Sequence, residues 1–320
     1  MPSLRLPAAL LATFLPSAYF FLHVHQHRDS HGQERRIIDL GNLVRTYLLA
    51  GILGTSLSML IQSILSYLIA LLSFRNNATV MEYLTESMKK SDVNDQVRTT
   101  RRREMSRNPR YWLFILLFCF LGPGLIEEGT KYLAIVFAVG RDHQLHLSKN
   151  GVADAPAAGK FYLYLFTGCT AGLAFATFEN VAFFVGAALS SRESGEQNNP
   201  TEIQTQPHPG DDPLSLLSVL ERVLIATPGH TMAGALIGMN LLTRGSSRRL
   251  VPTIDVWEVL RDPVLLHGLW DFWLLAVSAW EGNVGWQHPR TKSTICVALL
   301  GVIGVQVILA SLLWDKLSQY

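Results

Sequence analysis

Residues 122–131 read Gly-Pro-Gly-Leu-Ile-Glu-Glu-Gly-Thr-Lys and lie inside a long apolar run, residues 111–139. Two adjacent carboxylates, Glu127 and Glu128, and the lysine Lys131 therefore stand in a segment long enough to cross a bilayer. An acidic side chain at the centre of a membrane helix costs about 2.5 to 3.5 kcal/mol on insertion scales. Because ionisable groups at this depth are costly, the stretch predicts a functional site.

The composition is that of a membrane protein. The 320 residues are 49% hydrophobic and only 16% charged, and the apolar residues gather into membrane-length runs. These runs predict an all-α, polytopic, integral membrane bundle of about seven spans, or eight if Gly122-Pro123-Gly124 splits the third. We treat residues 1–320 as one membrane domain. The spans are expected at residues 6–24, 43–74, 111–139, 161–189, 214–242, 256–280 and 293–314.

Several classes of site receive no support. A net charge of +2, with no basic patch among aromatic residues, gives no indication of nucleic acid. Cys119, Cys169 and Cys296 lie in apolar spans and lack disulfide or metal spacing, so they are expected to be small buried hydrophobes. The first span is a signal anchor or first helix, which we favour, or a removed signal peptide.

Two polar segments, residues 75–110 and 190–213, are predicted to be loops. The first carries seven of the chain's 20 arginines and favours the cytoplasmic face, where it could touch anionic lipid. It also contains a glycosylation sequon at Asn77, which would place it on the lumenal side. Orientation and the identity of the membrane therefore stay open.

Proline in the 122–131 stretch predicts a kink or break about one turn before the glutamates, because Pro123 lacks a backbone donor and clashes with the preceding turn. Freed backbone groups in a membrane must be buried in protein or line a watery cavity. A pocket is therefore expected beside Glu127 and Glu128. Lys131 follows them by four and three residues, on the same helical face.

Later spans carry further polar residues on stripes of small residues. In the fourth span Glu179-Asn180 continues a stripe of glycines, and in the fifth span His230 is followed by glycines at four-residue steps, with Arg222 upstream. In the sixth span His267 and Asp271 are four residues apart, so Asp271 could accept a hydrogen bond from one ring nitrogen and fix the tautomer.

The depths of these residues can be compared by counting about 1.5 Å per residue from the end that the third and fourth spans share. Glu127 and His230 lie roughly 21 Å from that side, and Glu179 roughly 28 Å, so these three are predicted to meet. His267 lies only about 9 Å from Arg261. Either the Arg261-Asp262 pair is itself within the membrane, or the histidine approaches obliquely.

In their order these motifs resemble the PrsW intramembrane protease family, which is itself similar to type II CAAX prenyl endopeptidases and related bacteriocin-processing (CPBP) proteases. The resemblance runs from Gly122 to Phe272, within a core of residues 111–280. It implies an endopeptidase that cleaves membrane-anchored or membrane-proximal peptide segments. Its substrates would be membrane proteins or lipid-anchored peptides. The motifs are Glu127-Glu128-x-x-Lys131, Phe175-x-x-x-Glu179-Asn180, Arg222 with His230 and Gly238, and His267-x-x-x-Asp271.

Two mechanisms fit these residues. In the metal-dependent one, Glu179, His230 and His267 hold Zn2+ with an open position, and Glu127 or Glu128 takes a proton from water. In the metal-free one, the glutamate pair activates water, while both histidines and Asn180 donate to the oxyanion. Lys131, Asn180, Arg222 and Asp271 are supporting residues in either case.

Two other classes of function remain. Broken helices and intramembrane carboxylates also mark ion sites, so an ion- or proton-coupled transporter is an alternative. Against it, the sequence has no internal repeat, and its ionisable groups bunch in the third to sixth spans. A catalytically silent relative that binds membrane partners is the third interpretation.

Overall fold

The computed structural model describes residues 5–30, 39–88, 96–150, 157–196, 216–245, 255–286, 288–289 and 291–320. Within these ranges the chain is helical, as the sequence predicts. The chain divides into two compact units. Unit 1 comprises Met1–Thr55, Lys131–Ile254 and Asp315–Tyr320, and unit 2 comprises Ser56–Thr130 and Asp255–Trp314.

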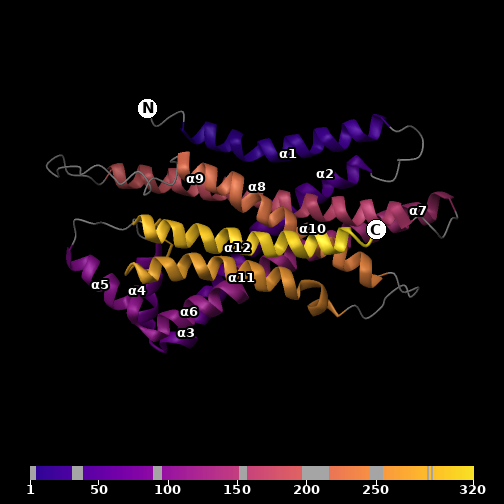
Figure 1. Ribbon diagram of the computed structural model, residues 1–320. Coiled ribbons are helices and arrows are strands. Elements are labelled where there is room, and N and C mark those ends of the chain that lie inside the picture. The colour runs from indigo at the N-terminus through magenta and orange to yellow at the C-terminus, as the bar shows by residue number, and fades with distance from the viewer. Residues whose placement is uncertain are drawn as a thin grey trace. The chain divides into compact units, whose positions relative to one another are not determined.

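Unit 1 contains the N-terminal helices and the fourth and fifth predicted spans (Figure 1). Its elements are α1 (Arg5–Ser30), α2 (Leu40–Leu48), the π-helical turn η3 (Leu49–Gly54), α7 (Glu128–Asn150) from Lys131 onward, α8 (Ala157–Glu196), α9 (Leu216–Glu221), the π-helical turn η5 (Arg222–Ala226) and α10 (Thr227–Gly245).

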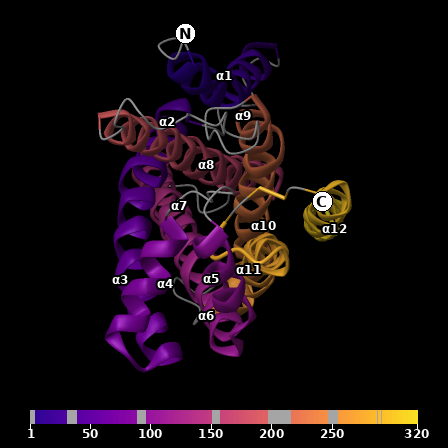
Figure 2. The same cartoon turned by 90° about the vertical axis from the view of Figure 1, so that its left-hand side faces the viewer.

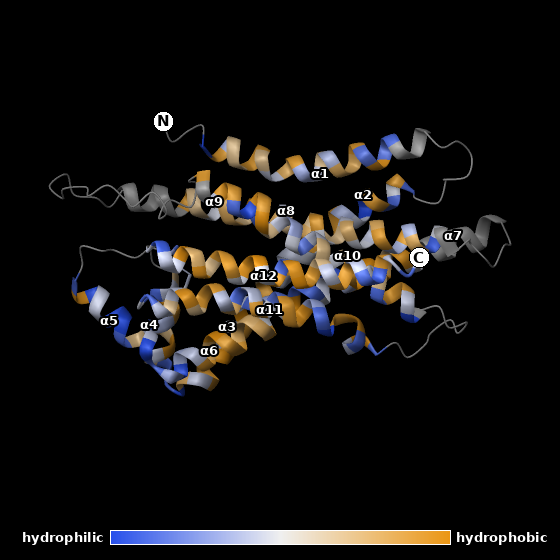
Figure 3. Ribbon diagram, in the orientation of Figure 1, coloured by the Kyte–Doolittle hydropathy of each residue, from blue (hydrophilic) through white to orange (hydrophobic). Residues whose placement is uncertain are grey.

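Unit 2 contains the remaining helices. Figure 3 shows the contrast between its apolar α12 and its hydrophilic α5. Its elements are α3 (Thr55–Phe74) from Ser56 onward, α4 (Asn77–Met88), α5 (Gln96–Arg107), α6 (Pro109–Cys119), the π-helical turn η4 (Phe120–Glu127), the first three residues of α7, α11 (Val256–Trp280) and α12 (Lys292–Leu317) up to Trp314.

Six candidate membrane spans occur among the described residues, so the multi-pass prediction is confirmed but the count of seven is not. The predicted span at 214–242 is not among the six. There Arg222, Thr227 and His230 reduce the apolar character of the helix. The six spans are Arg5–Gln26, Leu40–Phe74, Pro109–Gly140, Gly159–Leu189, Val256–Trp280 and Lys292–Leu317.

The prediction of a loop at residues 75–110 is wrong, because α4 and α5 occupy most of it. The Asn76 side chain caps α4 by accepting a hydrogen bond from the Ala78 amide at 2.9 Å. Two ion pairs then join α4 to α5 across the unit: Arg98 with Glu86 at 3.0 Å, and Arg101 with Glu82 at 2.8 Å. The charges that indicated a loop therefore link two helices.

The other predicted loop, residues 190–213, is also partly helical. Helix α8 continues through its first residues and ends at Glu196. The remainder of that segment lies outside the described residues.

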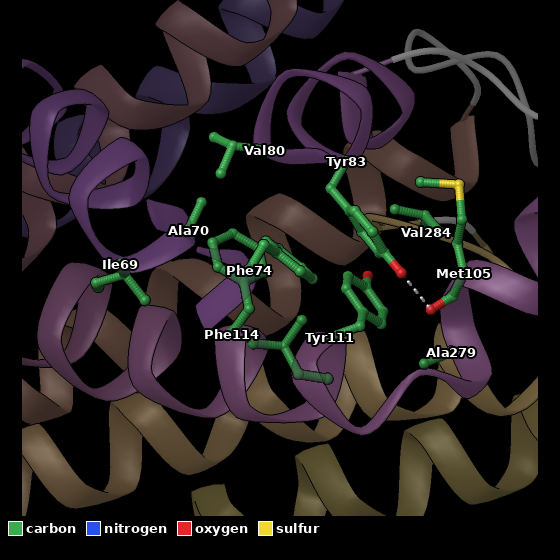
Figure 4. Packing of buried hydrophobic residues seen from close by; sticks show 11 residues of the cluster. Ile69, Ala70, Phe74, Val80, Tyr83, Met105, Tyr111, Phe114, Ala279 and Val284 are labelled. Carbon is green, nitrogen blue, oxygen red and sulfur yellow. Dashed lines mark hydrogen bonds between the residues drawn. The ribbon is translucent and has the colours of Figure 1, made fainter. Parts of the chain in front are cut away.

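The core of unit 2 explains why α4 packs so firmly. Phe74 and Tyr83 stack with ring centroids 4.1 Å apart, and Tyr83 also stacks on Tyr111 at 5.5 Å. The Tyr83 hydroxyl donates to the Met105 carbonyl at 3.1 Å (Figure 4). Arg102 is only 2% exposed, and its guanidinium donates to the Val284 carbonyl at 2.9 Å. These contacts tie α3, α4, α5, α6 and the turn after α11 together.

In unit 1, α1 lies beside α8 in both views (Figures 1 and 2). A buried hydroxyl chain links three of its helices: Tyr47 donates to Ser17 at 2.8 Å, and Ser17 lies 3.0 Å from the Thr177 hydroxyl. A hydroxyl that bonds to a neighbouring helix is no longer an unsatisfied polar group in the apolar interior. These hydroxyls hold α1 and α2 against α8 at Thr177, two residues before Glu179.

Glycines bring α8 and α10 into backbone contact. A Cβ atom at Gly168 would lie 2.4 Å from the Gly234 carbonyl oxygen, and one at Gly238 would lie 2.3 Å from the Tyr164 carbonyl oxygen. At Gly172 the Cβ would lie 2.1 Å from the carbonyl oxygen of His230 itself. The stripe of small residues predicted from the sequence is thus the contact that places His230 against α8.

We expect Gly172→Ala to destabilise the protein by about 1 to 3 kcal/mol, because the new methyl group meets backbone that cannot move away alone. Gly186→Ala on the same helix is the matched control, since nothing lies within 4 Å of its added Cβ. Thermal unfolding in detergent measures both variants. Equal melting temperatures would contradict the close contact between α8 and α10.

Candidate active site

Glu127 and Glu128 lie where a π-helical turn meets an α-helix. Pro123 removes one backbone donor, and the chain accommodates it as the wide turn η4, which ends at Glu127; α7 begins at Glu128. The proline therefore modifies the span without splitting it, because residues 109–140 count as one candidate span. Glu127 is 6% exposed and Glu128 is fully buried.

Two glycines allow η4 and α11 to touch. A Cβ atom at Gly124 would lie 3.0 Å from the Val264 carbonyl oxygen, and one at Gly268 would lie 2.6 Å from the Phe120 ring. Without side chains at these positions, the backbones approach closely. His267, next to Gly268 in the chain, is thereby brought beside the glutamate pair.

His267 contacts both glutamates, each through a different ring nitrogen. Its Nδ1 lies 2.6 Å from Glu128 Oε1, and its Nε2 lies 3.6 Å from Glu127 Oε2. An ionised carboxylate only accepts hydrogen bonds, so Nδ1 carries the proton and donates it to Glu128. In the neutral ring this tautomer leaves a lone pair on Nε2, the nitrogen that faces Glu127.

Asp271 contacts one ring nitrogen of His267, as its spacing suggested, but this contact is longer than that of Glu128. Its Oδ2 lies 3.5 Å from Nε2 of His267, whereas the short contact to Nδ1 belongs to Glu128. Glu128 therefore fixes the tautomer, and Asp271 lies on the side of the ring that faces Glu127. The shallow position of His267 is also explained, because Arg261 and Asp262 belong to the candidate span Val256–Trp280.

A second set of predicted residues comes together in unit 1 around His230. Its Nε2 lies 3.1 Å from Glu179 Oε2, and its Nδ1 lies 2.9 Å from Lys131 Nζ. The lysine is completely buried, and its ammonium also lies 4.9 Å from the centre of the Phe175 ring. Nδ1 is thus paired with Lys131, and Nε2 is the ring nitrogen that faces Glu179.

Arg222 and Asn180 extend this set. Arg222 begins the π-helical turn η5, and its Nη1 lies 3.3 Å from Glu179 Oε1 and 3.5 Å from Asn180 Oδ1. The guanidinium also stacks over the Phe183 ring at 4.1 Å, a cation–π contact that fixes its plane. Glu179 is thus held between an arginine and a histidine.

The sequence reasoning missed polar residues of α3, in a span to which it assigned no motif. Gln62 Nε2 donates to Glu127 Oε1 at 3.0 Å. The signal that could have found Gln62 is its amide in the middle of an otherwise apolar span. Thr227 was also missed; its hydroxyl bonds Asn180 at 3.3 Å and the Arg222 carbonyl at 3.0 Å.

Donor chemistry and spacing in the described residues fit a metal ion. Imidazole nitrogen and carboxylate oxygen are ordinary Zn2+ ligands, bound at about 2.0 to 2.2 Å. Two such donors on a tetrahedral ion lie about 3.4 Å apart. In unit 2, Nε2 of His267 and Oε2 of Glu127 are 3.6 Å apart, and in unit 1, Nε2 of His230 and Oε2 of Glu179 are 3.1 Å apart.

The structure defines the class: a helical membrane protein whose candidate spans carry the buried carboxylates Glu127 and Glu128 beside the imidazole of His267. A comparison with protein families matches residues 106–308 to the PrsW family of intramembrane metalloproteases. The match covers more than half of the chain, so the chain belongs to this family, and the resemblance seen in the motifs is confirmed. No curated protein and no solved structure matches the chain.

Membership of this family implies a metal-dependent protease that lies in the membrane and acts on protein substrates. The histidine and glutamate side chains likewise suggest a metal ion.

Proposed function

We propose that this protein is an intramembrane endopeptidase that cleaves membrane-anchored or membrane-proximal peptides with a bound Zn2+ ion. The single observation that carries the proposal is the buried arrangement in which Glu128 fixes the His267 tautomer and Glu127 faces the other ring nitrogen. An imidazole held this way by a carboxylate is the usual second shell of a metal-ligating histidine.

The proposed ligands are Glu179, His230 and His267. Three protein ligands with one open position are typical of hydrolytic zinc sites. Support comes from the donor types, because imidazole nitrogen and carboxylate oxygen are ordinary Zn2+ ligands. Glu127 is a further candidate ligand, because its carboxylate faces Nε2 of His267.

The bound ion would supply Lewis acidity, polarising the peptide carbonyl and lowering the pKa of a bound water. Glu127 is the proposed general base: it accepts a proton from the attacking water and returns it to the leaving amine. Glu128 keeps His267 in the tautomer that leaves Nε2 for the ion. Asn180 and Arg222 orient Glu179, and Lys131 orients His230.

The test compares membrane-anchored protein fragments in cells that carry the native protein or His267→Ala, each with and without a chelator. Fragments that require both His267 and the metal are expected. Fragments that disappear in the variant but persist with the chelator would favour the metal-free glutamate mechanism. Identical fragments in all four samples would contradict a protease and leave a silent binding protein.

A further inference from the structure

Helix α3 lies outside the part of the chain that matches the protease family, residues 106–308, yet it reaches the glutamate pair. Its residue Gln62 is half-buried, whereas its neighbours Ser63 and Ile64 are exposed. The Gln62 amide donates to Glu127 Oε1 at 3.0 Å. Both residues belong to unit 2.

A second contact one turn earlier on α3 leads to the backbone of the same glutamate. The hydroxyls of Ser58 and Thr130 are 2.9 Å apart, and the Thr130 hydroxyl donates to the Glu127 carbonyl at 2.9 Å. Because Thr130 uses its proton on that carbonyl, Ser58 is the donor to Thr130. Ser58 and Gln62 stand four residues apart, so one face of α3 reaches both the carbonyl and the carboxylate of Glu127.

The Gln62 side chain lies beside Gly122 of η4. A Cβ atom at Gly122 would lie 4.0 Å from Gln62 Cγ, an ordinary van der Waals distance. An amide inside a membrane span loses its water partners, and hydrogen bonds to charged groups are stronger than those between neutral groups. The Gln62–Glu127 contact gives the amide a buried acceptor and gives one carboxylate oxygen of Glu127 a donor.

We propose that Gln62 is a positioning residue for the reaction: it holds the Glu127 carboxylate with Oε1 toward α3 and Oε2 toward His267. The inference rests on the proposed function and adds a residue from a span outside the matched region. Glu127 must present one oxygen to a water and then to a leaving amine, so rotation of the carboxylate would misplace the base. Small misplacements of catalytic groups lower turnover steeply.

The first test is Gln62→Met, which keeps the length and flexibility of the side chain but removes the donor. With a membrane-anchored reporter that the native protein cleaves, kcat is expected to fall about 10- to 100-fold, the range of one hydrogen bond to a charged group. KM and Zn2+ affinity are expected to stay within about twofold, because the contact of Gln62 is with Glu127, the proposed base, and not with Glu179, His230 or His267. Ser63→Ala is the matched control, since its hydroxyl bonds only the Met59 carbonyl among its recorded contacts.

A second variant covers the case in which methionine disturbs folding. Gln62→Glu has the same shape but replaces the donor with an acceptor beside Glu127, so its kcat is expected to fall further than that of Gln62→Met. If either variant keeps the native kcat while its melting temperature falls, the glutamine serves helix packing alone and the inference is overturned.

Different results would overturn the role of Gln62 and the proposed function. If the native protein is active, His267→Ala is inactive and Gln62→Met keeps the native kcat, only the role proposed for Gln62 is wrong. A native protein that cleaves no membrane-anchored substrate and binds no Zn2+ overturns both.

Discussion

Glu127→Gln is expected to abolish cleavage, with kcat reduced by about 100- to 10,000-fold, the range that a general base supplies. The amide keeps the shape of the carboxylate and can still accept a hydrogen bond from Gln62, so the fold and the η4 turn should survive. It cannot take a proton from water. Turnover of a membrane-anchored reporter and thermal unfolding of the purified variant measure the two effects separately.

Zn2+ affinity separates the general-base role of Glu127 from its alternative role as a ligand. A base can be lost while the ion stays, so Glu127→Gln should retain Zn2+ and stay inactive at any Zn2+ concentration. Glu104→Gln is the control, because Glu104 is exposed on α5. Loss of the ion from Glu127→Gln would show that Glu127 is a ligand, and native turnover would remove it from the mechanism altogether.

Glu128→Gln should give a different result, namely weaker metal binding. The 2.6 Å contact from Glu128 Oε1 to Nδ1 keeps the proton off Nε2 of His267, and a neutral amide holds that tautomer less firmly. Removing an outer-shell partner of this kind costs about 10- to 100-fold in metal affinity. Cleavage should therefore be lost at low Zn2+ and return in part as Zn2+ is raised.

The contrast between the two neighbouring glutamates is the informative part of this experiment. Excess Zn2+ should restore Glu128→Gln and leave Glu127→Gln inactive. If the two variants respond to Zn2+ alike, the separate roles given to Glu127 and Glu128 are wrong. Zn2+ titration followed by reporter cleavage distinguishes these outcomes in one series.

Much of the site could be predicted because charge is rare in membrane spans. Glu127, Glu128 and His267 stand out from apolar surroundings, and each lies in a buried contact in the structure. Which partner each would choose could not be predicted. The spacing of His267 and Asp271 indicated a hydrogen bond within one helix, but the glycine contact between η4 and α11 brings Glu128 closer. That contact depends on how η4 and α11 pack together, and the spacing of residues along one helix carries no information about such packing.

The polar segment at 75–110 shows a different limit of prediction from the sequence. Its many arginines predict a solvated loop, because charged residues rarely supply a core. In the structure Arg102 is buried, and Tyr83 joins an aromatic cluster with Phe74 and Tyr111. The partners of these side chains come from residues far along the chain, such as Val284.

Gln62 illustrates a residue that motif reasoning overlooks. A single amide in an apolar span matches no catalytic pattern, and its importance appears only when its partner, Glu127, is known. The predicted span at 214–242 is not among the six candidate spans: it carries Arg222, whose side chain contacts Glu179, and His230, which make this helix less apolar.

The most direct measurement is the Zn2+ content of the purified protein, per chain, for the native sequence, His230→Ala and His267→Ala. One ion in the native protein, lost on either substitution, is the expected result, because both histidines are proposed to hold the same ion. An ion that persists when either histidine is replaced, or a native protein that is active with no ion, would contradict a shared metal centre.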